Sequence, residues 1–465
     1  MDTDKIKIYG NIFICFVEAG VLGLPYAFKE SGILEGLIVT LFISFFSVKS
    51  MLLLVDCRYK CLSKMGDLED NSQKMSLIKN AFENETDELN SDEYDSDDSK
   101  TVKDKNSRNH KLNPHKNLKL NSSSSDIQIT YYTIANQVLG RFGGWLVDIL
   151  VIVSQLGFCC AYLIFISENA TRYLLKCDHE VLNGTEYKNC EEKLTFYSNN
   201  ILLCLMLPLV ILSQIRNLDR LAIFSLMAGF TNIFAYLIVF WFDFEHVQHV
   251  KVEVKEMDFT GLPFFFSASM YLYGVAGMVL PLEDSLPKEH RPHFKTYFRN
   301  AVACIVALEL MFGISGYLSF GETTESIITL NLPEGVLPNI IKFCLCIALI
   351  FTYPVMIFPV TETLEQKFSS KPGLFIGSLI RLISPILTWF IVKAIPSFSA
   401  IMGLIGATTC SLLLFILPPI LHFLLHRQSI PKKAMVLDLF LVCLGVVSAV
   451  VGTRDAVYRI QAAHE

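Results

Sequence analysis

An apolar segment near the start of the chain is interrupted by Glu18-Ala19-Gly20-Val21-Leu22-Gly23-Leu24-Pro25. Two glycines and a proline in so short a stretch disfavour a continuous helix, because glycine costs backbone entropy and proline lacks the amide donor. A second apolar segment, over residues 262–282, holds a similar weak point at Tyr273-Gly274-Val275-Ala276-Gly277, with Pro281 behind it. The sequence therefore predicts two helices that are each broken near the middle.

Long apolar segments of this kind recur along the whole chain. Hydrophobic residues make up 52% of its 465 positions and charged residues only 18%, and a helix that crosses a bilayer needs about 20 mostly apolar residues. By that length we count about eleven segments, near residues 11–28, 33–55, 145–173, 199–215, 221–242, 262–282, 297–319, 337–365, 374–395, 400–426 and 434–453. We predict an all-α integral membrane protein with about eleven transmembrane helices, of which the first and sixth are broken.

The two broken helices occupy matching places if the chain is built as two halves of five helices plus one extra. Matching breaks in two halves are typical of inverted-repeat transporters, because a break frees backbone groups that can bind a zwitterion or an ion. The alternative is that the glycines only let helices pack closely. The predicted substrate-binding residues are Glu18, Ala19, Gly20, Val21, Leu22, Tyr273, Gly274, Val275, Ala276 and Gly277.

The distribution of lysine and arginine predicts the orientation, because positively charged loops stay in the cytoplasm. With a cytoplasmic N-terminus and every segment crossing, the basic loops share the cytoplasmic side; they hold Arg58, Lys60, Arg216, Arg220, Lys288, Arg291, Lys295, Arg299, Arg427, Lys432 and Lys433. We therefore expect a cytoplasmic N-terminus over residues 1–10, helices one and two within 11–55, helices three to eleven within 131–453, and a short non-cytosolic C-terminus over 454–465.

Two segments lie between these helices and carry other signals. Residues 56–130 are predicted to be a disordered cytoplasmic insertion, because they are rich in charged and polar residues and almost lack aromatics; whether it is a passive linker or regulatory stays open. The loop over 177–197 falls on the luminal or extracellular side and contains Cys177, Cys190 and the sequon Asn183-Gly184-Thr185. A disulfide between the two cysteines and a glycan on Asn183 would both fit that side, in the plasma membrane or in an endolysosomal or vacuolar membrane.

Several blocks of sequence follow one another in the order of a known family. The first is Gly20-Val21-Leu22-Gly23-Leu24-Pro25-Tyr26-Ala27-Phe28; the others are Ser154-Gln155-Leu156-Gly157-Phe158-Cys159-Cys160, Gly277-Met278-Val279-Leu280-Pro281-Leu282-Glu283, Gly316-Tyr317-Leu318-Ser319-Phe320-Gly321, Thr329-Leu330-Asn331-Leu332-Pro333 and Val451-Gly452-Thr453-Arg454. By these blocks the chain resembles the amino acid/auxin permease superfamily, and within it the proton-assisted amino acid transporters. The resemblance implies a LeuT-type fold, a five-plus-five inverted repeat with one further helix, and the substrate held between the broken helices. It also implies secondary active transport of amino acids by alternating access, commonly as proton symport.

Glu18 departs from the family pattern, which usually has a small residue at that position. A charged acid at that depth costs roughly 2.5–3.5 kcal/mol on insertion scales. In one interpretation Glu18 meets the positive end of the substrate or carries the coupled proton, and it then favours lysine or arginine as substrate. In the other it bonds to a neighbouring helix without a role in transport. For Asp148, Glu168 and Glu309, in or near other segments, we favour interhelical bonds or side chains that reach to the interface.

Other classes of function find little support in the sequence. It lacks the paired residues of an intramembrane enzyme, so we expect no catalysis, no cofactor and no metal. A net charge of −6 argues against nucleic-acid binding. The expected partners are an amino acid, protons, with sodium as the alternative coupling ion, and membrane lipids. A sensor of the same fold with little or no flux would share every residue named here, and only flux would separate it from a carrier.

Overall fold

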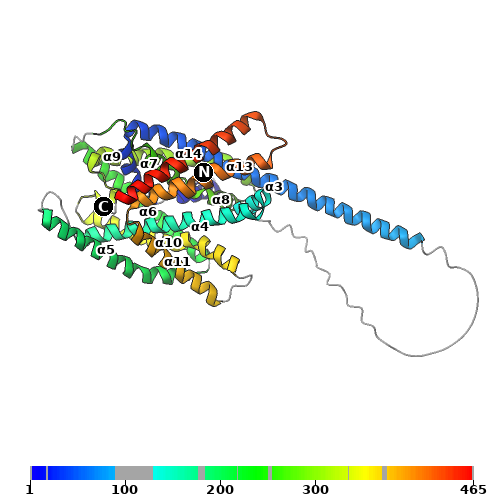
Figure 1. Cartoon of the computed structure of the whole chain (residues 1–465), viewed down its shortest axis with the longest axis horizontal. Coiled ribbons are helices and arrows are strands. Elements are labelled where there is room, and N and C mark those ends of the chain that lie inside the picture. The colour runs from blue at the N-terminus through cyan, green and yellow to red at the C-terminus, as the bar shows by residue number, and fades with distance from the viewer. Residues whose placement is uncertain are drawn as a thin grey trace, which may run out of the picture. The chain divides into compact units, whose positions relative to one another are not determined.

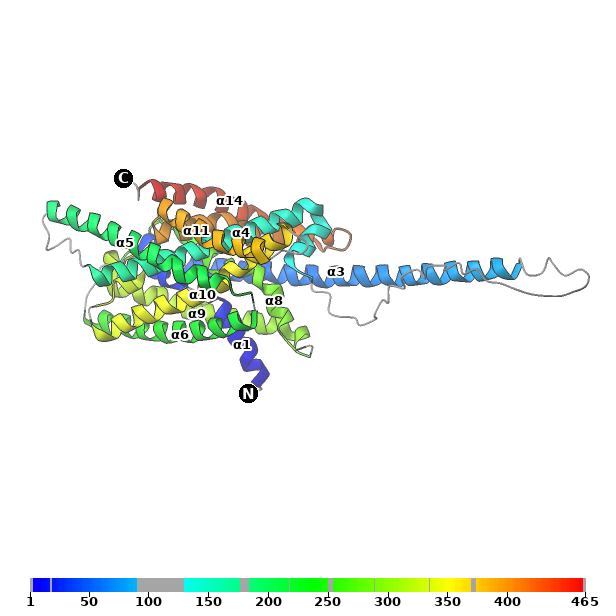
Figure 2. The same ribbon diagram turned by 90° about the horizontal axis from the view of Figure 1, so that it is seen from below.

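The computed structural model describes residues 3–16, 19–89, 129–175, 184–216, 218–249, 254–287, 289–333, 335–368 and 374–462. The chain divides into two compact units, Met1–Cys57 with Thr130–Glu465 and Arg58–Ile129. Every regular element in the described part of the chain is a helix, which confirms the predicted all-α class. In the first unit the long helices α4, α5, α6 and α10 lie side by side with their axes nearly aligned (Figures 1 and 2).

The first broken helix consists of α1 (Thr3–Phe16), a short 3₁₀ segment η1 (Ala19–Gly23) and α2 (Leu24–Ser31). The two parts, Ile8–Phe16 and Ala19–Ser31, are bent by 48° relative to each other, and Figure 2 shows α1 leaving the bundle at a steep angle. The second broken helix consists of α7 (Leu262–Leu272), the 3₁₀ segment η2 (Gly274–Met278) and α8 (Val279–Asp284). Both breaks lie at the glycines that the sequence indicated.

The remaining helices follow the predicted apolar segments, usually with longer ends. Their bounds are α3 (Ile33–Leu89), α4 (Tyr131–Leu174), α5 (Gly184–Ser213), α6 (Leu218–His249), α9 (Phe294–Phe320), α10 (Val336–Phe368), α11 (Leu374–Ala394), α12 (Phe398–Ile405), α13 (Leu417–Leu425) and α14 (Lys432–Ala462). Two π-helical segments, η6 (Gly406–Cys410) and η7 (Leu412–Ile416), join α12 to α13.

The described residues contain nine helical spans long and apolar enough to cross a membrane, or ten if the bent pair at the N-terminus is one span. One of the nine, Leu262–Asp284, includes the second break, and α6 adds a shorter apolar stretch over Ala228–Asp243. These counts establish a multi-pass membrane protein.

Helix α3 continues to Leu89, beyond residue 55, where the apolar segment was expected to end. Residues 56–89 are therefore helical, whereas residues 90–128 lie outside the described residues. The sequence from 56 to 89 has one glycine and no proline, so a helix that is already nucleated in the membrane can extend through it at little cost.

Helix α4 is the central helix of the first unit. It packs against α5, α10, α11 and α12, and every residue from Leu156 to Ser167 is buried. A helix that is apolar on all sides is stable only when protein surrounds it. Residues on this half of α4 therefore face other helices, which makes them candidates for lining an internal site.

Three elements meet closely around Ser267 of α7. A side chain at Gly406 of η6 would overlap the backbone carbonyl of Ser267, and a side chain at Gly452 of α14 would overlap its hydroxyl. The same hydroxyl donates a hydrogen bond to the carbonyl oxygen of Pro263, at 2.8 Å. Because only glycine allows backbones to approach so closely, α7, η6 and α14 are held together at this point.

Candidate functional site

The two breaks lie close to each other in space, although more than 240 residues separate them in the sequence. A Cβ atom on Gly20 would lie 2.9 Å from Cε1 of Tyr271 and 3.1 Å from Cδ2 of Leu272, at the end of α7. A Cβ atom on Gly274 would lie 2.8 Å from Sγ of Cys410 and from Cζ of Phe158. Both glycines are therefore required by close approach, and the structure brings together the two stretches that were predicted to bind substrate.

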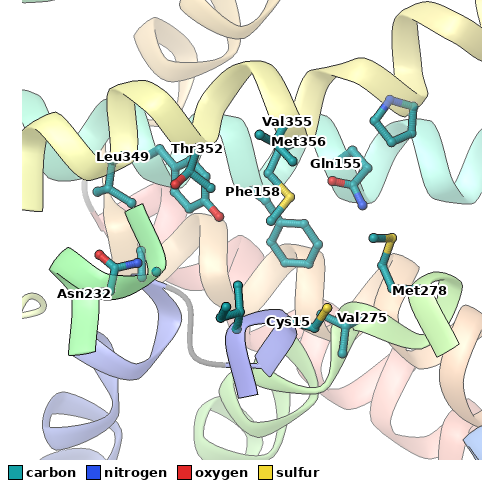
Figure 3. A pocket seen from close by; sticks show the side chains of 15 residues that line it. Cys15, Gln155, Phe158, Asn232, Val275, Met278, Leu349, Thr352, Val355 and Met356 are labelled. Atoms are coloured by element: carbon teal, nitrogen blue, oxygen red, sulfur yellow. The ribbon is translucent and has the colours of Figure 1, made fainter. Parts of the chain in front are cut away.

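A cavity of about 100 Å³ lies beside both breaks. This is several times the space that a single water needs. Its lining residues come from α1, η1, α4, α6, η2 and α10: Ile14, Cys15, Ala19, Gln155, Phe158, Tyr162, Gly229, Asn232, Val275, Met278, Leu349, Thr352, Val355, Met356 and Pro359. Figure 3 shows Phe158 between Asn232 and Gln155, with Val355 and Met356 on one side and Cys15 and Val275 on the other. None of the described lining residues carries a charge.

The cavity lies toward the α1 side of the first break, since Ile14 and Cys15 line it and no described residue of α2 or α7 does. On the opposite side the half-helices α2 and α7 pack tightly together: Phe28 and Phe265 are completely buried, and their rings stand edge to face with centroids 5.0 Å apart. Leu24, on the first turn of α2, is only 1% exposed. The site is thus closed toward α2 and α7 by apolar packing.

The predicted binding residues differ in where the structure places them relative to the cavity. Ala19 and Val275 line the cavity, while Gly20, Val21, Leu22, Gly274 and Ala276 are buried around it; Gly277 follows them in η2. Tyr273 makes a different contact, because its hydroxyl donates a hydrogen bond to Oε2 of Glu309 on α9, at 2.9 Å. Glu18 lies outside the described residues, as do Cys177 and Asn183, so their roles stay predictions.

The structure adds two amide side chains that the sequence had not singled out as ligands. Asn232 of α6 is 6% exposed, and its Oδ1 has no hydrogen-bond partner among the described residues. The same holds for Oε1 of Gln155 on α4. A hydroxyl near them, Oγ1 of Thr352, is already engaged, since it donates to the carbonyl oxygen of Ala348 at 2.9 Å. An amide in the middle of an apolar segment was the available signal for Asn232.

These amides define what the cavity is able to bind. A buried acceptor without a donor costs about 1–3 kcal/mol, and a ligand that brings N–H or O–H groups removes that cost. Because an amide side chain both donates and accepts, Asn232 and Gln155 suit the mixed donors and acceptors of an amino acid. The apolar remainder of the wall, including Phe158 and Leu349, suits an aliphatic or aromatic side chain.

Two of the other intramembrane acids make interhelical contacts, as the sequence interpretation favoured. Asp148 of α4 pairs with Nζ of Lys367 on α10, at 2.8 Å. Glu309 of α9 bonds to Tyr273, as described above. Neither residue is among those that line the cavity.

Comparison with known proteins agrees with this architecture. The family model described as transmembrane amino acid transporter protein matches residues 6–70 and 115–457, and leaves out the middle of the predicted insertion. Amino acid transporter AVT3A of Arabidopsis thaliana is 29% identical to the chain, over 98% of the chain and 90% of that protein. Amino acid transporter ANT1 of the same plant is 26% identical, over 98% and 93%. This chain therefore belongs to the transmembrane amino acid transporter family, within the amino acid/auxin permeases that its motifs resemble, a family of transporters and not of enzymes.

Proposed function

We propose that this protein is a secondary active transporter that moves amino acids across its membrane by alternating access, with proton symport. The observation that carries the proposal is the cavity beside both helix breaks, which is lined by Asn232 and Gln155, two amides whose buried oxygens have no donor among the described residues. Breaks at the substrate site are typical of transporters built from inverted repeats. The relatives named as amino acid transporters support the class of substrate.

The order of the helices supports a LeuT-type repeat of eleven spans. Four further spans follow the first break, namely α3, α4, α5 and α6, and four follow the second, namely α9, α10, α11 and the α12–α13 pair. One helix, α14, remains. In this arrangement the broken helices are the first of each half, and one bundle rocks against the other around a site at the midplane.

Backbone groups at the breaks are expected to hold the ends of the substrate. The N-terminal end of a half-helix favours a carboxylate and the C-terminal end favours a cation. We place the carboxylate near η1, where α2 begins, and the ammonium near the ends of α1 and α7. Residues 18–22 and 273–277 supply these groups, and the amides of Asn232 and Gln155 accept the remaining donors. With the cavity on the α1 side, the state described here would be reached from the cytoplasm.

Uptake into proteoliposomes tests this function. The purified protein is reconstituted and offered labelled arginine, lysine, alanine, proline and glutamate, with and without an inward proton gradient, and then with a sodium gradient. Uptake that the proton gradient stimulates is the expected result. Stimulation by the sodium gradient alone would make sodium, and not the proton, the coupling ion. Binding without flux under any gradient would identify the protein as a sensor and not a carrier.

Glu18 gives the first prediction about specificity. If its carboxylate meets the substrate, arginine competes with labelled substrate more strongly than alanine does. The Glu18→Gln variant then loses this preference by about tenfold or more, because removing one partner of a buried charge pair costs roughly 2 kcal/mol or more. Equal competition profiles for the variant and the wild type would assign Glu18 to packing alone.

A further inference from the structure

Glu309 is an acidic residue in the middle of a transmembrane helix. It lies fifteen residues from the start of α9 and eleven from its end, and it is 2% exposed. One carboxyl oxygen, Oε2, accepts a hydrogen bond from the hydroxyl of Tyr273 at 2.9 Å. The other, Oε1, is buried and has no hydrogen-bond partner among the described residues. An acid at this depth is costly and marks a functional site by default.

Two cations on α2 and α9, Lys29 and Lys295, are engaged away from Glu309. Helix α9 packs mainly against α1, α2 and α6. On α2, Lys29 donates to the carbonyl oxygen of Thr324, and Glu30 pairs with Arg459. On α9 itself, Lys295 pairs with Asp56 of α3. Within the described part of the chain, no ion pair therefore compensates a charge on Glu309.

The titratable groups that face α9 nearest to Glu309 are phenols. Tyr273 is the group in contact, and the ring of Tyr236 on α6 packs edge to face on Phe312, one turn along, with centroids 5.6 Å apart. Asp243 of α6 meets α9 farther along, where its backbone carbonyl accepts from Ser319; ten residues of helix separate Ser319 from Glu309, about 15 Å. On α1, Tyr9 packs on Tyr297, which lies three turns before Glu309.

Tyr273 connects Glu309 to both breaks. It is the residue at which α7 ends and η2 begins, directly before Gly274. Its ring lies 6.2 Å from that of Phe16, the last residue of α1, and Phe16 in turn packs on Phe298 of α9 at 5.8 Å. A change at Glu309 therefore reaches the point where each broken helix ends.

We propose that Glu309 is the residue that binds the coupled proton, and that Tyr273 transmits its charge state to the broken helices. This inference rests on the transport function proposed above. The carboxylate, when charged, holds the end of α7 against α9 through the Tyr273 hydroxyl. When one proton adds to a carboxyl oxygen, the bond loses its charge assistance, and the neutral acid is cheaper to bury. The end of α7 is then released from α9, and the broken helices are free to rearrange.

The test separates exchange from gradient-driven accumulation in proteoliposomes. Exchange is measured at equal pH, with labelled amino acid outside and unlabelled amino acid inside, using the amino acid that wild-type protein carries best. Accumulation is measured with an inward gradient of one pH unit, which drives about tenfold accumulation of a neutral substrate carried with one proton. The Glu309→Gln variant keeps the volume and an acceptor for Tyr273 but binds no proton. We expect it to exchange substrate and to lose the tenfold accumulation.

Asp148→Asn is the matched control, because it makes the same change of carboxyl to amide on a residue that pairs with Lys367 away from the cavity. It should accumulate substrate like wild type. A Glu309→Gln variant that also accumulates substrate overturns the inference. A wild-type protein that exchanges without responding to the gradient overturns proton coupling, whereas one without any flux overturns the transport function itself.

If Glu309→Gln loses exchange as well as accumulation, two more variants test whether Glu309 binds the coupled proton. Glu309→Asp retains a carboxyl group and should accumulate substrate. Tyr273→Phe removes the hydroxyl donor and should move the pH of half-maximal uptake upward, because a hydrogen bond to the charged form is lost. An Asp variant without accumulation, or a Phe variant with the pH profile of wild type, contradicts the inference.

Discussion

Asn232 is a polar side chain that lines the cavity, and its buried oxygen has no hydrogen-bond donor among the described residues. Such a group lowers the stability of the protein when no ligand is bound, because a buried unpaired acceptor costs about 1–3 kcal/mol. The same oxygen binds more strongly to a charged ammonium than to a neutral donor. Under the proposed function, this cost is offset when the substrate donates a hydrogen bond to Asn232.

Replacing Asn232 by leucine should separate these two effects. Leucine has the same number and branching of side-chain heavy atoms and no polar atoms, so we expect thermal unfolding in detergent to show a gain of about 1 kcal/mol in stability. Transport should fall about tenfold or more, since a hydrogen bond to a charged group contributes about 1.5–3 kcal/mol. Loss of both stability and transport would mean that Asn232 is a structural residue.

Asn169 supplies the control for this substitution. Its Nδ2 donates to the carbonyl oxygen of Phe165 and its Oδ1 accepts from Thr329 at 2.8 Å, so both ends of the amide are paired. Asn169→Leu should therefore lower stability where Asn232→Leu raises it.

At this scale the sequence predicts part of the site. The glycine patterns led directly to Ala19 and Val275, because a broken helix has a local signature. Asn232 stands out in the sequence only as an amide within an apolar segment, and Gln155 has no such signal. Both reach the cavity through the convergence of α4, α6 and α10, which are distant in the chain and whose facing surfaces no local pattern specifies. Tyr273 was placed at the break correctly, but its bond to Glu309 depends on how α7 and α9 pack.

Among the elements, the break at η2 is tightly packed around Gly274. The close neighbours of Gly274 are Sγ of Cys410 and the ring of Phe158, and Phe158 also forms part of the cavity wall. A methyl group at this position would push the ring into the cavity. The geometry of η2 and the width of the site are therefore coupled.

Gly274→Ala should accordingly reduce transport and stability together. Adding a methyl group to a well-packed interior costs about 1–3 kcal/mol, and the displaced Phe158 should raise the KM for substrate. Uptake kinetics and thermal unfolding measure the two effects. Gly403→Ala on α12 is the control, since its nearest neighbour, Cδ2 of Phe264, would lie at an ordinary 3.5 Å; similar losses in both variants would rule out a special role for the break.

Element positions were predicted well and element ends less well. Helix α14 passes residue 453 and ends at Ala462, because polar residues near its end are stabilised by ion pairs: Arg459 bonds to Asp455 and Glu30, each at 2.8 Å. Hydropathy marks where a segment is apolar and carries no information about such pairs. The same limit explains why α3 was expected to end near residue 55.

For the whole molecule, the charge pattern predicts the orientation of the chain in the membrane. The fold does not test this prediction. The basic loops, the sequon at Asn183 and the pair Cys177 and Cys190 all give the same answer from independent chemistry. The helical class and the membrane location followed from composition. The pairing of the two breaks in space needed the structure.

Glycosylation of Asn183 tests the orientation directly. Expressed in a eukaryotic cell, the protein should lose mass on treatment with an N-glycosidase, and Asn183→Gln should abolish that shift without affecting transport, since the residue is far in sequence from the cavity-lining residues. Cys190 should react with a thiol reagent only after reduction. An unglycosylated protein whose residue 190 reacts freely would reverse the predicted orientation.

The contact at Ser267 has a mechanical consequence for the transport cycle. Since Gly406 and Gly452 allow no gap around Ser267, α7 lacks the freedom to slide past η6 or α14. If α7 moves, the motion left to it is a tilt about Ser267, which lies near the middle of the helix. Helix α7 would then act as a lever, so that a small displacement at its C-terminal end, beside Tyr273, would appear reversed in direction at its N-terminal end.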